Sequence, residues 1–337
     1  MSPPPAEIVC CGHVCLDVIP ALRVGTLPPP GGLAEVGPAA LATGGSVSNT
    51  GLALHRLGLG VRLVGRVGRD LFGDEVRRRY AAAGPGLSDH LQTVDDQPTS
   101  YTVVISPPDG DRRFLHCPGV NATFTDVDVD ALALHGARHL HFGYPPAMRA
   151  VCADDGAALS RLLQCARSAG LTTSLDMCGV DPGGWAAAVD WPALLRRALP
   201  HVDVFMPSAD ELHAMAPGVA ASEVLGWGCR ALVVKDGTRG LTIATGATAE
   251  SLGAGWGGRR LRSPTFEVPV VGTTGAGDVT IAGFLAGMLR GAPLDQAADL
   301  ACAAGAHCVQ TADATSGLCS LDRLRAFLKT DPPRRRA

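Results

Sequence analysis

The sequence contains few lysines and few aromatic residues. Lysine occurs only at positions 235 and 329, so nearly all of the basic residues are arginines. Aromatic residues make up 4% of the 337-residue chain, whereas hydrophobic residues make up 46%. A core of this composition must be built mostly from Ala, Val and Leu. The length suits one large α/β domain or two smaller ones.

The sequence also lacks a strong excess of charge and a long apolar run. The net charge is −3, which gives no electrostatic reason to expect a nucleic-acid partner. The first residues have neither a basic segment nor a long apolar segment, so they do not resemble a signal peptide. The longest apolar stretch, 279–289, is too short to span a bilayer. We therefore expect a cytoplasmic protein without a membrane partner.

Complete metal-binding and disulfide patterns are missing as well. The eleven cysteines are irregularly spaced and include no C-x-x-C pair, which favours reduced, buried thiols. The acidic stretch 125–130 begins like a calcium loop, but Ala131 and Ala137 stand where Gly and Glu are needed. A capped helix start is the favoured interpretation. His139 and His141 share one face of a predicted strand, and without a third ligand they are interpreted as structural.

The most informative stretch is the run VVGTTGAGDVT at 270–280. Its β-branched start predicts a strand, its glycines predict a tight turn, and the apolar segment 281–289 predicts a helix. Such a turn directs free backbone N–H groups and the positive end of the helix dipole at one point. This arrangement binds an anion without any basic side chain.

Asp278 is the unusual member of this loop, because a carboxylate repels a bound anion. It is suited to take a proton from a hydroxyl while the backbone amides hold the phosphoryl group that the hydroxyl attacks. The alternative is that Asp278 merely caps the helix. The loop is not a Walker A loop, since it has no lysine. It is not a dinucleotide fingerprint either, because Thr280 replaces the third glycine, which disfavours a dehydrogenase.

Strands and helices alternate along most of the chain, which predicts a mainly parallel sheet with helices on both faces. A hairpin with a Pro/Gly turn is predicted at 101–106 and 112–117, and hairpins of this kind often cover a site. We expect one domain over 1–330 and a solvated basic tail at 331–337. The predicted strands are 8–12, 61–67, 138–143, 171–176, 202–206 and 231–235. One helix is predicted to end at about Leu57, and four others are predicted at 70–83, 151–169, 295–309 and 321–328.

Several polar residues follow the ends of predicted strands, where ligands bind in parallel sheets. They are Asp176, Ser208, Glu211, Gly237 and Asp278. Taken alone, Ser208 and Glu211 also fit a helix capping box.

The first part of the chain offers a second group of candidates. Asp17 lies in an apolar run, so its carboxylate needs ligand hydroxyls or backbone amides as partners. Gly44 and Gly45 permit a close backbone approach, and Asn49 should point to the same place. Ser46 or Ser48 is a candidate cap for the helix that follows.

Taken together, these segments resemble the ribokinase/PfkB family of sugar kinases over nearly the whole chain. Gly44, Gly45 and Asn49 are similar to that family's N-terminal signature. Residues 273–278, Thr-Thr-Gly-Ala-Gly-Asp, are similar to its specific C-terminal signature. The resemblance implies a ribokinase-like α/β fold with a small β lid at about 14–40 and 99–117.

The resemblance also implies a role for each matching residue. Asp278 would be the catalytic base, and the anion hole would be formed by Gly275, Ala276 and Gly277. The residues implied to hold the substrate are Asp17, Gly44, Gly45 and Asn49, with Tyr144 and Asp176 as further pocket candidates. Those implied to line the ATP site are Ser208, Lys235, Gly237, Gly240 and Thr273, with the helix around His307 along the purine. Glu211 would orient Mg²⁺ through water.

The chain departs from the family pattern in ways that bear on cations and substrate. The family usually has Asp at the position of Gly272, where it helps to build a monovalent-cation site, so K⁺ activation does not carry over directly. The usual Asn-x-x-Glu appears as Ser208-x-x-Glu211, which keeps the acid and loses the amide.

These observations predict an ATP-dependent kinase that phosphorylates a hydroxymethyl group of a sugar or sugar-like molecule. A nucleoside kinase of the same family and a non-catalytic sugar or nucleotide sensor are the alternatives. The family's lid strands often pair between subunits, so the resemblance also allows a homodimer through the lid.

Overall fold

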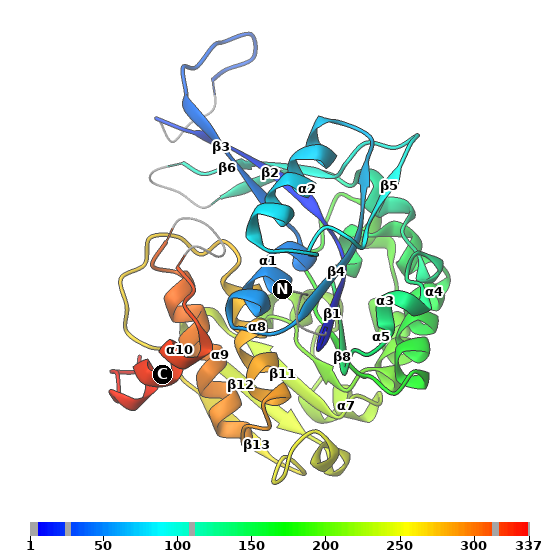
Figure 1. Ribbon diagram of the computed structural model, residues 1–337, viewed down its shortest axis with the longest axis vertical. Helices are drawn as coiled ribbons and strands as arrows, with labels where there is room; N and C mark the ends of the chain where they lie inside the picture. Colours follow the sequence, from blue (N-terminus) through cyan, green and yellow to red (C-terminus); the bar gives the residue numbers. More distant parts are fainter. Residues whose placement is uncertain (1–5, 24–27, 108–111, 312–316, 336–337) are drawn as a thin grey trace.

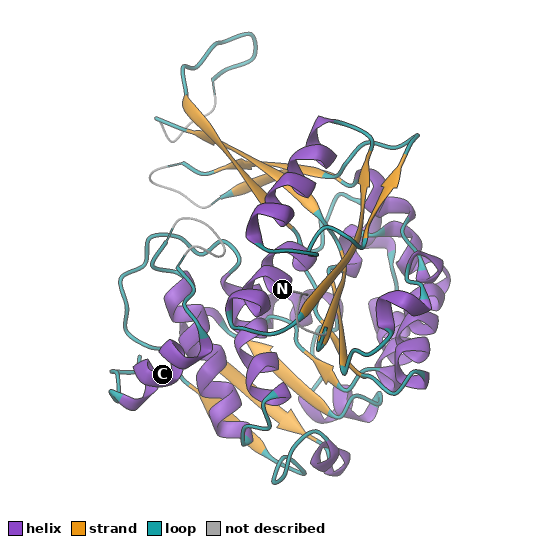
Figure 2. Cartoon of the chain, in the orientation of Figure 1, coloured by secondary structure: helices purple, strands orange, loops and turns teal. Residues whose placement is uncertain are grey.

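A nine-stranded sheet forms the centre of the computed structural model, and helices lie on both of its faces (Figures 1 and 2). The structure describes residues 6–23, 28–107, 112–311 and 317–335. All neighbouring strands are parallel except β12, which runs antiparallel to both of its neighbours. In sheet order the strands are β13 (Arg260–Ser263), β12 (Leu241–Thr245), β11 (Ala231–Lys235), β10 (Val204–Phe205), β9 (Thr172–Leu175), β8 (His139–Gly143), β1 (Ile8–Gly12), β4 (Val61–Gly68) and β5 (Leu91–Val94).

Both faces of the sheet are buried beneath helices, and successive strand residues point to opposite faces. In β1, Ile8 and Cys10 belong to one hydrophobic core, whereas Val9 and Cys11 belong to the other. The first core contains side chains of α1 (Ser46–Arg56), α2 (Leu71–Ala83), α8 (Ala276–Leu289), α9 (Leu294–Cys308) and α10 (Leu321–Lys329). The second contains side chains of α3 (Ala131–Leu134), α4 (Arg149–Ser168, interrupted at 153–156), α5 (Trp191–Ala198), α6 (Ala209–Met215) and α7 (Ala221–Gly226).

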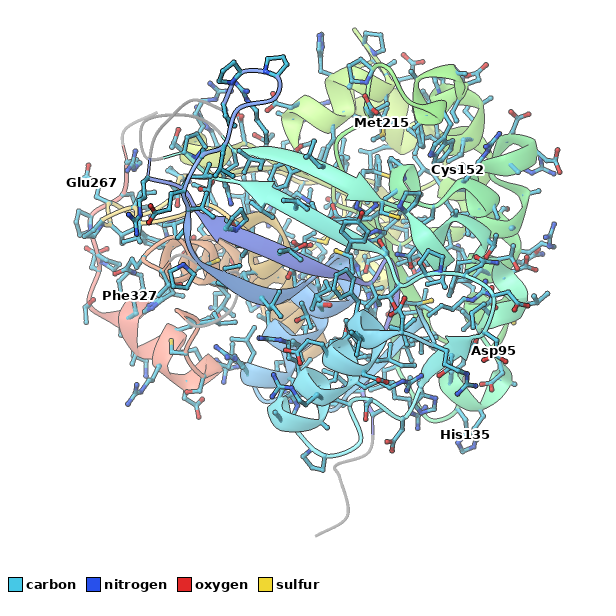
Figure 3. All side chains as sticks on the ribbon, turned by 90° about the horizontal axis from the view of Figure 1, so that it is seen from above. Asp95, His135, Cys152, Met215, Glu267 and Phe327 are labelled. Atoms are coloured by element: carbon cyan, nitrogen blue, oxygen red, sulfur yellow. The ribbon has the colours of Figure 1, made fainter. Side chains whose placement is uncertain are left out.

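A separate four-stranded sheet forms a lid, which lies across the body of the protein when seen from above (Figure 3). Its order is β3 (Gly37–Gly44), β2 (Cys15–Ala21), β6 (Tyr101–Ile105) and β7 (Arg113–Cys117). The predicted hairpin is confirmed, since β6 and β7 pair antiparallel. Most of its predicted Pro/Gly turn, at 108–110, lies outside the described residues.

The strand predicted before the glycine-rich loop is wrong. Val270 and Val271 are 53% and 65% exposed and belong to no strand. The N–H groups of Val271 and Gly272 instead donate to the carbonyl of Val309, at the end of α9. A β-branched run forms a strand only where a neighbouring strand can pair with it, and this segment crosses the end of the sheet. The strands β12 and β13, which complete this side of the sheet, were not predicted.

The helix caps follow the sequence in part. Asp70 caps α2 by accepting from the Gly73 N–H at 2.8 Å, as predicted. The expected serine cap of α1 is wrong, because its N-cap is Gly45 and no side chain bonds there. The hydroxyl of Ser48 instead donates back to the Gly44 carbonyl at 2.7 Å.

The end of the chain is attached to the domain rather than free in solvent. The Glu267 N–H donates to the Pro333 carbonyl at 2.9 Å. The guanidinium of Arg334 pairs with Asp299 at 2.7 Å and lies 4.4 Å from the centre of the Phe266 ring. The expected solvated tail therefore does not describe residues 333–335.

Candidate active site

Two cavities meet at the N-terminus of α8. The sheet-end cavity, of about 490 Å³, opens at the carboxyl ends of β9 to β11. The lid cavity, of about 830 Å³, lies between the lid and the body. Residues that line both cavities mark their junction: Tyr144, Glu211, Thr273, Gly275 and Asp278. A group held at this junction can contact ligands in both cavities.

The loop before α8 presents free backbone donors at the junction. Gly275 adopts a left-handed conformation with φ of 70°, which favours glycine, and α8 begins at the next residue. Within the described chain, the N–H groups of Gly275, Gly277 and Asp278 donate to no acceptor. The Ala276 N–H, predicted to belong to the same anion hole, donates instead to the Thr273 carbonyl at 3.3 Å. The free donors and the helix dipole make this loop a site for an anion.

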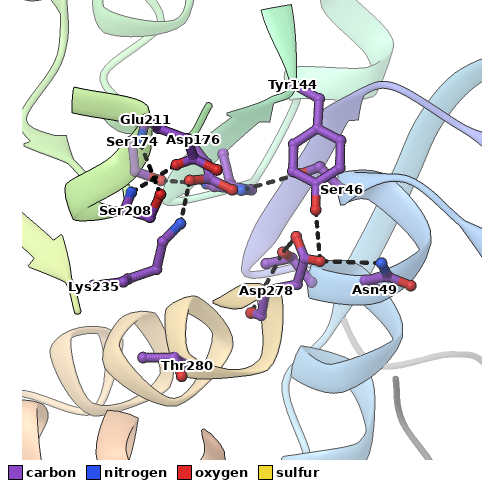
Figure 4. Close-up of polar contacts among 12 residues, drawn as sticks. Ser46, Asn49, Tyr144, Ser174, Asp176, Ser208, Glu211, Lys235, Asp278 and Thr280 are labelled. Carbon is purple, nitrogen blue, oxygen red and sulfur yellow. Dashed lines mark hydrogen bonds and ion pairs between the residues drawn. The ribbon is translucent and has the colours of Figure 1, made fainter. Parts of the chain in front are cut away.

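Asp278 lies in this first helical turn with its carboxylate aimed at the junction (Figure 4). Its side chain is buried, with 3% of the residue exposed. One oxygen accepts hydrogen bonds from the Asn49 amide at 3.0 Å and the Tyr144 hydroxyl at 2.7 Å. The other accepts from the Thr50 hydroxyl at 3.3 Å. Because the carboxylate is held by other elements and the N-cap is Gly275, Asp278 is not a simple helix cap.

The environment of Asp278 suits a group that takes up a proton. Burial raises the pKa of the Asp278 carboxyl above its ordinary value. The hydrogen bond from Tyr144, the charge of Lys235 and the hydrogen bond from Asn49 oppose this effect and lower the pKa. Tyr144 itself has φ of 67°, a costly conformation for a bulky residue. Such strain gathers at functional sites.

A buried ion pair lies beside the loop. The Lys235 ammonium donates to the Asp176 carboxylate at 2.5 Å, and the two residues are 8% and 1% exposed. Burial alone would lower the pKa of Lys235, but the neighbouring Asp176 and Glu211 raise it overall, so the lysine stays protonated. A Cβ on Gly277 would lie 3.9 Å from the Lys235 nitrogen, so the cation adjoins the anion loop. Asp176, predicted as a substrate residue, is thus engaged by Lys235.

The glycine pair makes room for the polar floor of the lid cavity. A Cβ on Gly44 would lie 2.5 Å from both carboxylate oxygens of Asp17, and one on Gly45 would lie 2.4 Å from the His13 carbonyl. This confirms the predicted close approach. Asp17 lines the lid cavity, and the thiol of Cys15 lies 3.4 Å from its carboxylate. Burial raises the pKa of Asp17 to about 6. Its two carboxylate oxygens can accept hydrogen bonds from ligand hydroxyls.

A sequence profile of the pfkB family of carbohydrate kinases matches residues 5–320. The chain belongs to this family. It is 29% identical over 322 residues to an ATP-dependent ribose-1-phosphate kinase of Halopiger xanaduensis, covering 96% of this chain and 98% of that protein. It is 28% identical to a 2-dehydro-3-deoxygluconokinase of Bacillus subtilis, covering 88% of this chain and 90% of that protein.

Solved structures confirm the ribokinase-like fold. The Arabidopsis thaliana ribokinase complexed with ribose and ATP superposes with a TM-score of 0.75 at 21% identity, over 98% of this chain and 99% of that one. A ribokinase II from E. coli in complex with ATP and Mg²⁺ superposes with a TM-score of 0.76 at 20% identity, over 96% and 99%. The protein is an ATP-dependent sugar kinase of the pfkB family. None of the described helices is long and apolar enough to cross a membrane.

All of the residues predicted for the ATP site except His307 line the kinase's sheet-end cavity. Gly237 and Gly240, after β11, lie in its wall with Lys235 and Thr273. Ser208 also lines it, but forms the capping box that the sequence had offered as the alternative. Its N–H donates to the Glu211 carboxylate at 2.6 Å, and its hydroxyl accepts from the Glu211 N–H at 3.1 Å.

The carboxylate of Glu211 also fits the expected role toward magnesium. It lines both cavities, and the capping box uses one of its oxygens, which leaves the other directed to solvent or ligand. The described residues contain no group of three His, Cys, Asp or Glu side chains that could hold a metal by themselves. A hydrated Mg²⁺ bound mainly by nucleotide phosphates is consistent with a single carboxylate. Gly272 offers no carboxylate to a monovalent cation.

The predicted histidines have structural roles. The ring of His307 packs against Phe327 of α10, with ring centres 5.1 Å apart, and does not line either cavity. The prediction for the helix fits better than that for the residue, since Gly305, Ala306 and Val309 of α9 do line the sheet-end cavity. His139 and His141 are buried and both bond the Ser174 hydroxyl at 2.8 Å, as expected for structural residues.

Sequence reasoning missed several residues at the kinase's junction and lid. Thr50 directly follows Asn49 in α1, so a helix that directs Asn49 at Asp278 also brings Thr50 close to it. His13 and His116 meet through their Nε2 atoms at 3.3 Å in the wall of the lid cavity. Arg112 crosses from the lid to the hydroxyl of Thr273. Arg112 and His116 reach the site only through the folded lid, so no local pattern could reveal them.

Proposed function

We propose that this kinase transfers the γ-phosphoryl group of ATP to a hydroxymethyl group of a sugar or sugar-like acceptor, with Asp278 as the base. The observation that carries the proposal is the position of Asp278. Its buried carboxylate stands at the junction of the two cavities, beside backbone N–H groups that find no acceptor in the described part of the chain. A carboxylate and an anion site side by side suit proton removal coupled to phosphoryl transfer.

In the proposed reaction, ATP occupies the sheet-end cavity and the acceptor occupies the lid cavity. The acceptor hydroxyl gives its proton to Asp278, and its oxygen forms a bond to the γ-phosphorus. The bond from the γ-phosphorus to the β,γ-bridging oxygen breaks, and ADP leaves with that electron pair. The N–H groups of Gly275 and Gly277 hold the transferring group. Glu211 would help to hold a Mg²⁺ ion, which would supply positive charge beside the phosphates.

The lid cavity supports a polyhydroxylated acceptor. The Asp17 carboxylate, which lines this cavity, can accept hydrogen bonds from acceptor hydroxyls. Asn49 and Tyr144 also line the cavity, but their side chains donate to Asp278. The two relatives named above act on ribose 1-phosphate and 2-dehydro-3-deoxygluconate, so acceptors with an anionic group belong in the test beside neutral sugars.

The test is ADP release with Mg-ATP across neutral sugars, sugar phosphates, sugar acids, polyols and nucleosides, with and without K⁺. Asp278→Asn is expected to lower kcat by about 10²–10⁴-fold while ATP still binds. Asp295→Asn, an exposed carboxylate in the first turn of α9, is the matched control and should retain wild-type rates.

Each outcome of the panel has a distinct meaning. Turnover on nucleosides alone would favour the nucleoside kinase. ATP binding without turnover on any acceptor would favour the sensor. Full activity of Asp278→Asn would refute the proposed base.

A further inference from the structure

Arg112 reaches from the lid to the junction of the two cavities. Its guanidinium donates a hydrogen bond to the hydroxyl of Thr273, which belongs to the loop before α8. Thr273 lines both cavities, and Arg112 lines the lid cavity together with Gly275 and Asp278. A side chain of the lid is therefore held against the loop that is proposed to bind the transferring phosphoryl group.

The Arg112 side chain is only partly exposed, yet no ion pair joins its guanidinium to an Asp or Glu of the described residues. Its other contact is the ring of Phe114, whose centre lies 6.0 Å from the guanidinium carbon. Most arginines in this protein that reach across the fold do find a carboxylate, for example Arg230 with Asp203 at 2.9 Å. A partly buried guanidinium with a neutral partner keeps donors free for an anionic ligand.

Two anions could use these donors: the transferring phosphoryl group or a fixed anionic group of the acceptor. The contact with Thr273 favours the first, because it anchors the guanidinium at the anion loop rather than deeper in the lid cavity. Asp17, which lines the lid cavity, is itself a carboxylate and disfavours an anion there.

We propose that Arg112 is a catalytic residue that the lid supplies in cis, and that it contacts the γ-phosphoryl group during transfer. The inference rests on the proposed function and adds a cationic side chain to the backbone anion hole. The planar guanidinium donates to the phosphoryl oxygens, over which negative charge spreads in the transition state. No bond to Arg112 forms or breaks.

The first test is kinetic and uses the best acceptor from the panel. Arg112→Ala is expected to lower kcat by about 10²–10³-fold, as for the loss of one oxyanion-hole donor. The KM values for ATP and acceptor should change by less than about threefold, because the contact is made in the transition state. Arg112→Lys should recover only part of the rate, since an ammonium lacks the planar fork. Added guanidinium ion should restore part of the activity of Arg112→Ala and none of Asp278→Asn.

Arg23→Ala is the matched control, because Arg23 is an exposed lid arginine that lines neither cavity. It should behave as wild type. A raised acceptor KM with unchanged kcat, confined to phosphorylated or acidic acceptors, would show that Arg112 binds the acceptor and would overturn the proposal. The expected loss of kcat in Arg112→Ala, if added guanidinium ion does not rescue it, would show that Arg112 only connects the lid to the loop and would overturn the proposal.

A second test needs no acceptor and separates this proposal from the proposed function. Calorimetry would compare ADP with ADP plus aluminium fluoride, which mimics the transferring phosphoryl group, in the presence of Mg²⁺. The wild type should bind the fluoride complex more tightly than ADP, and Arg112→Ala should lose this difference while its affinity for ADP stays the same. Retention of the difference in Arg112→Ala would overturn the role of Arg112, even if no acceptor were found.

Discussion

Replacing Tyr144 with Phe tests how the site sets the proton affinity of Asp278. The substitution keeps the ring and removes only the hydroxyl, which donates to the Asp278 carboxylate at 2.7 Å. After the effect of burial, which raises the pKa of Asp278, this hydrogen bond is the strongest influence on it, and it acts to lower the pKa. Tyr144→Phe should therefore raise the pKa of Asp278 further.

The size of the change follows from the energy of one hydrogen bond to a charged group. Such a bond contributes about 1.5–3 kcal/mol. One pKa unit corresponds to about 1.4 kcal/mol, so its loss raises the pKa by about one to two units. Asp278 must be ionised to accept a proton. A higher pKa therefore leaves less active enzyme at low pH, and the acid limb of the pH profile should move upward by about one to two pH units.

The assay is kcat/KM measured against pH with saturating ATP, for wild type and Tyr144→Phe. Tyr101→Phe is the control, because the Tyr101 ring packs on Phe72 and lines neither cavity. Its profile should match that of the wild type. An acid limb of Tyr144→Phe that stays in place or moves to lower pH would refute the assignment of Asp278 as a base tuned by Tyr144.

Four further predictions concern binding, turnover and stability. Asp17 has a folded-state pKa of about 6, above its ordinary 3.8, so it contributes stability below pH 3.8 that is lost as the pH rises to about 6. Asp17→Asn should therefore raise the free energy of unfolding by about 3 kcal/mol at pH 8 but by little at pH 4, as read by calorimetric melting, and should raise the acceptor KM. Gly277→Ala should leave Tm unchanged, since the new methyl meets nothing nearer than 3.8 Å, yet abolish turnover by blocking the phosphoryl site. Gly283→Ala places a methyl 2.7 Å from a carbonyl of α9 and should instead destabilise the fold by about 1–3 kcal/mol in urea titrations. Asp176→Ala should lower the free energy of unfolding by about 3–5 kcal/mol, because the buried Lys235 ammonium loses its partner. The double variant Asp176→Ala/Lys235→Met should recover stability but not activity. An Asp176→Ala protein as stable as the wild type would contradict the buried pair.

The elements that depend on residues close together in the sequence could be predicted from it. The continuous apolar runs of β1 and β11 are typical of strands that are buried on both faces of a parallel sheet, and β11 runs over the predicted residues. The glycine-rich turn, the start of α8 and the caps at Asp70 and Ser208 depend on nearby residues alone. The lid hairpin was also local, because β6 and β7 follow one another in the chain and pair antiparallel.

Elements that depend on distant partners were not predictable. Val270 and Val271 have high strand propensity, but no strand of the described residues pairs with them, and both side chains stay exposed. His307 lies on a helix that lines a cavity, yet its own side chain points to Phe327. A position on a helix fixes the side-chain direction only when the packing of that helix is known.

The sequence by itself determined the parallel α/β architecture, the anion-binding turn and the identity of Asp278 as its unusual carboxylate, because each rests on periodicity or on adjacent residues. Tertiary structure alone decided what surrounds that carboxylate. Asn49, Thr50 and Tyr144 reach Asp278 from elements 134 to 229 residues away in the chain. Hydrogen bonds and burial act over a few ångströms in space, whatever the separation along the chain. The chemistry of the site therefore followed from the fold, and its location from the sequence.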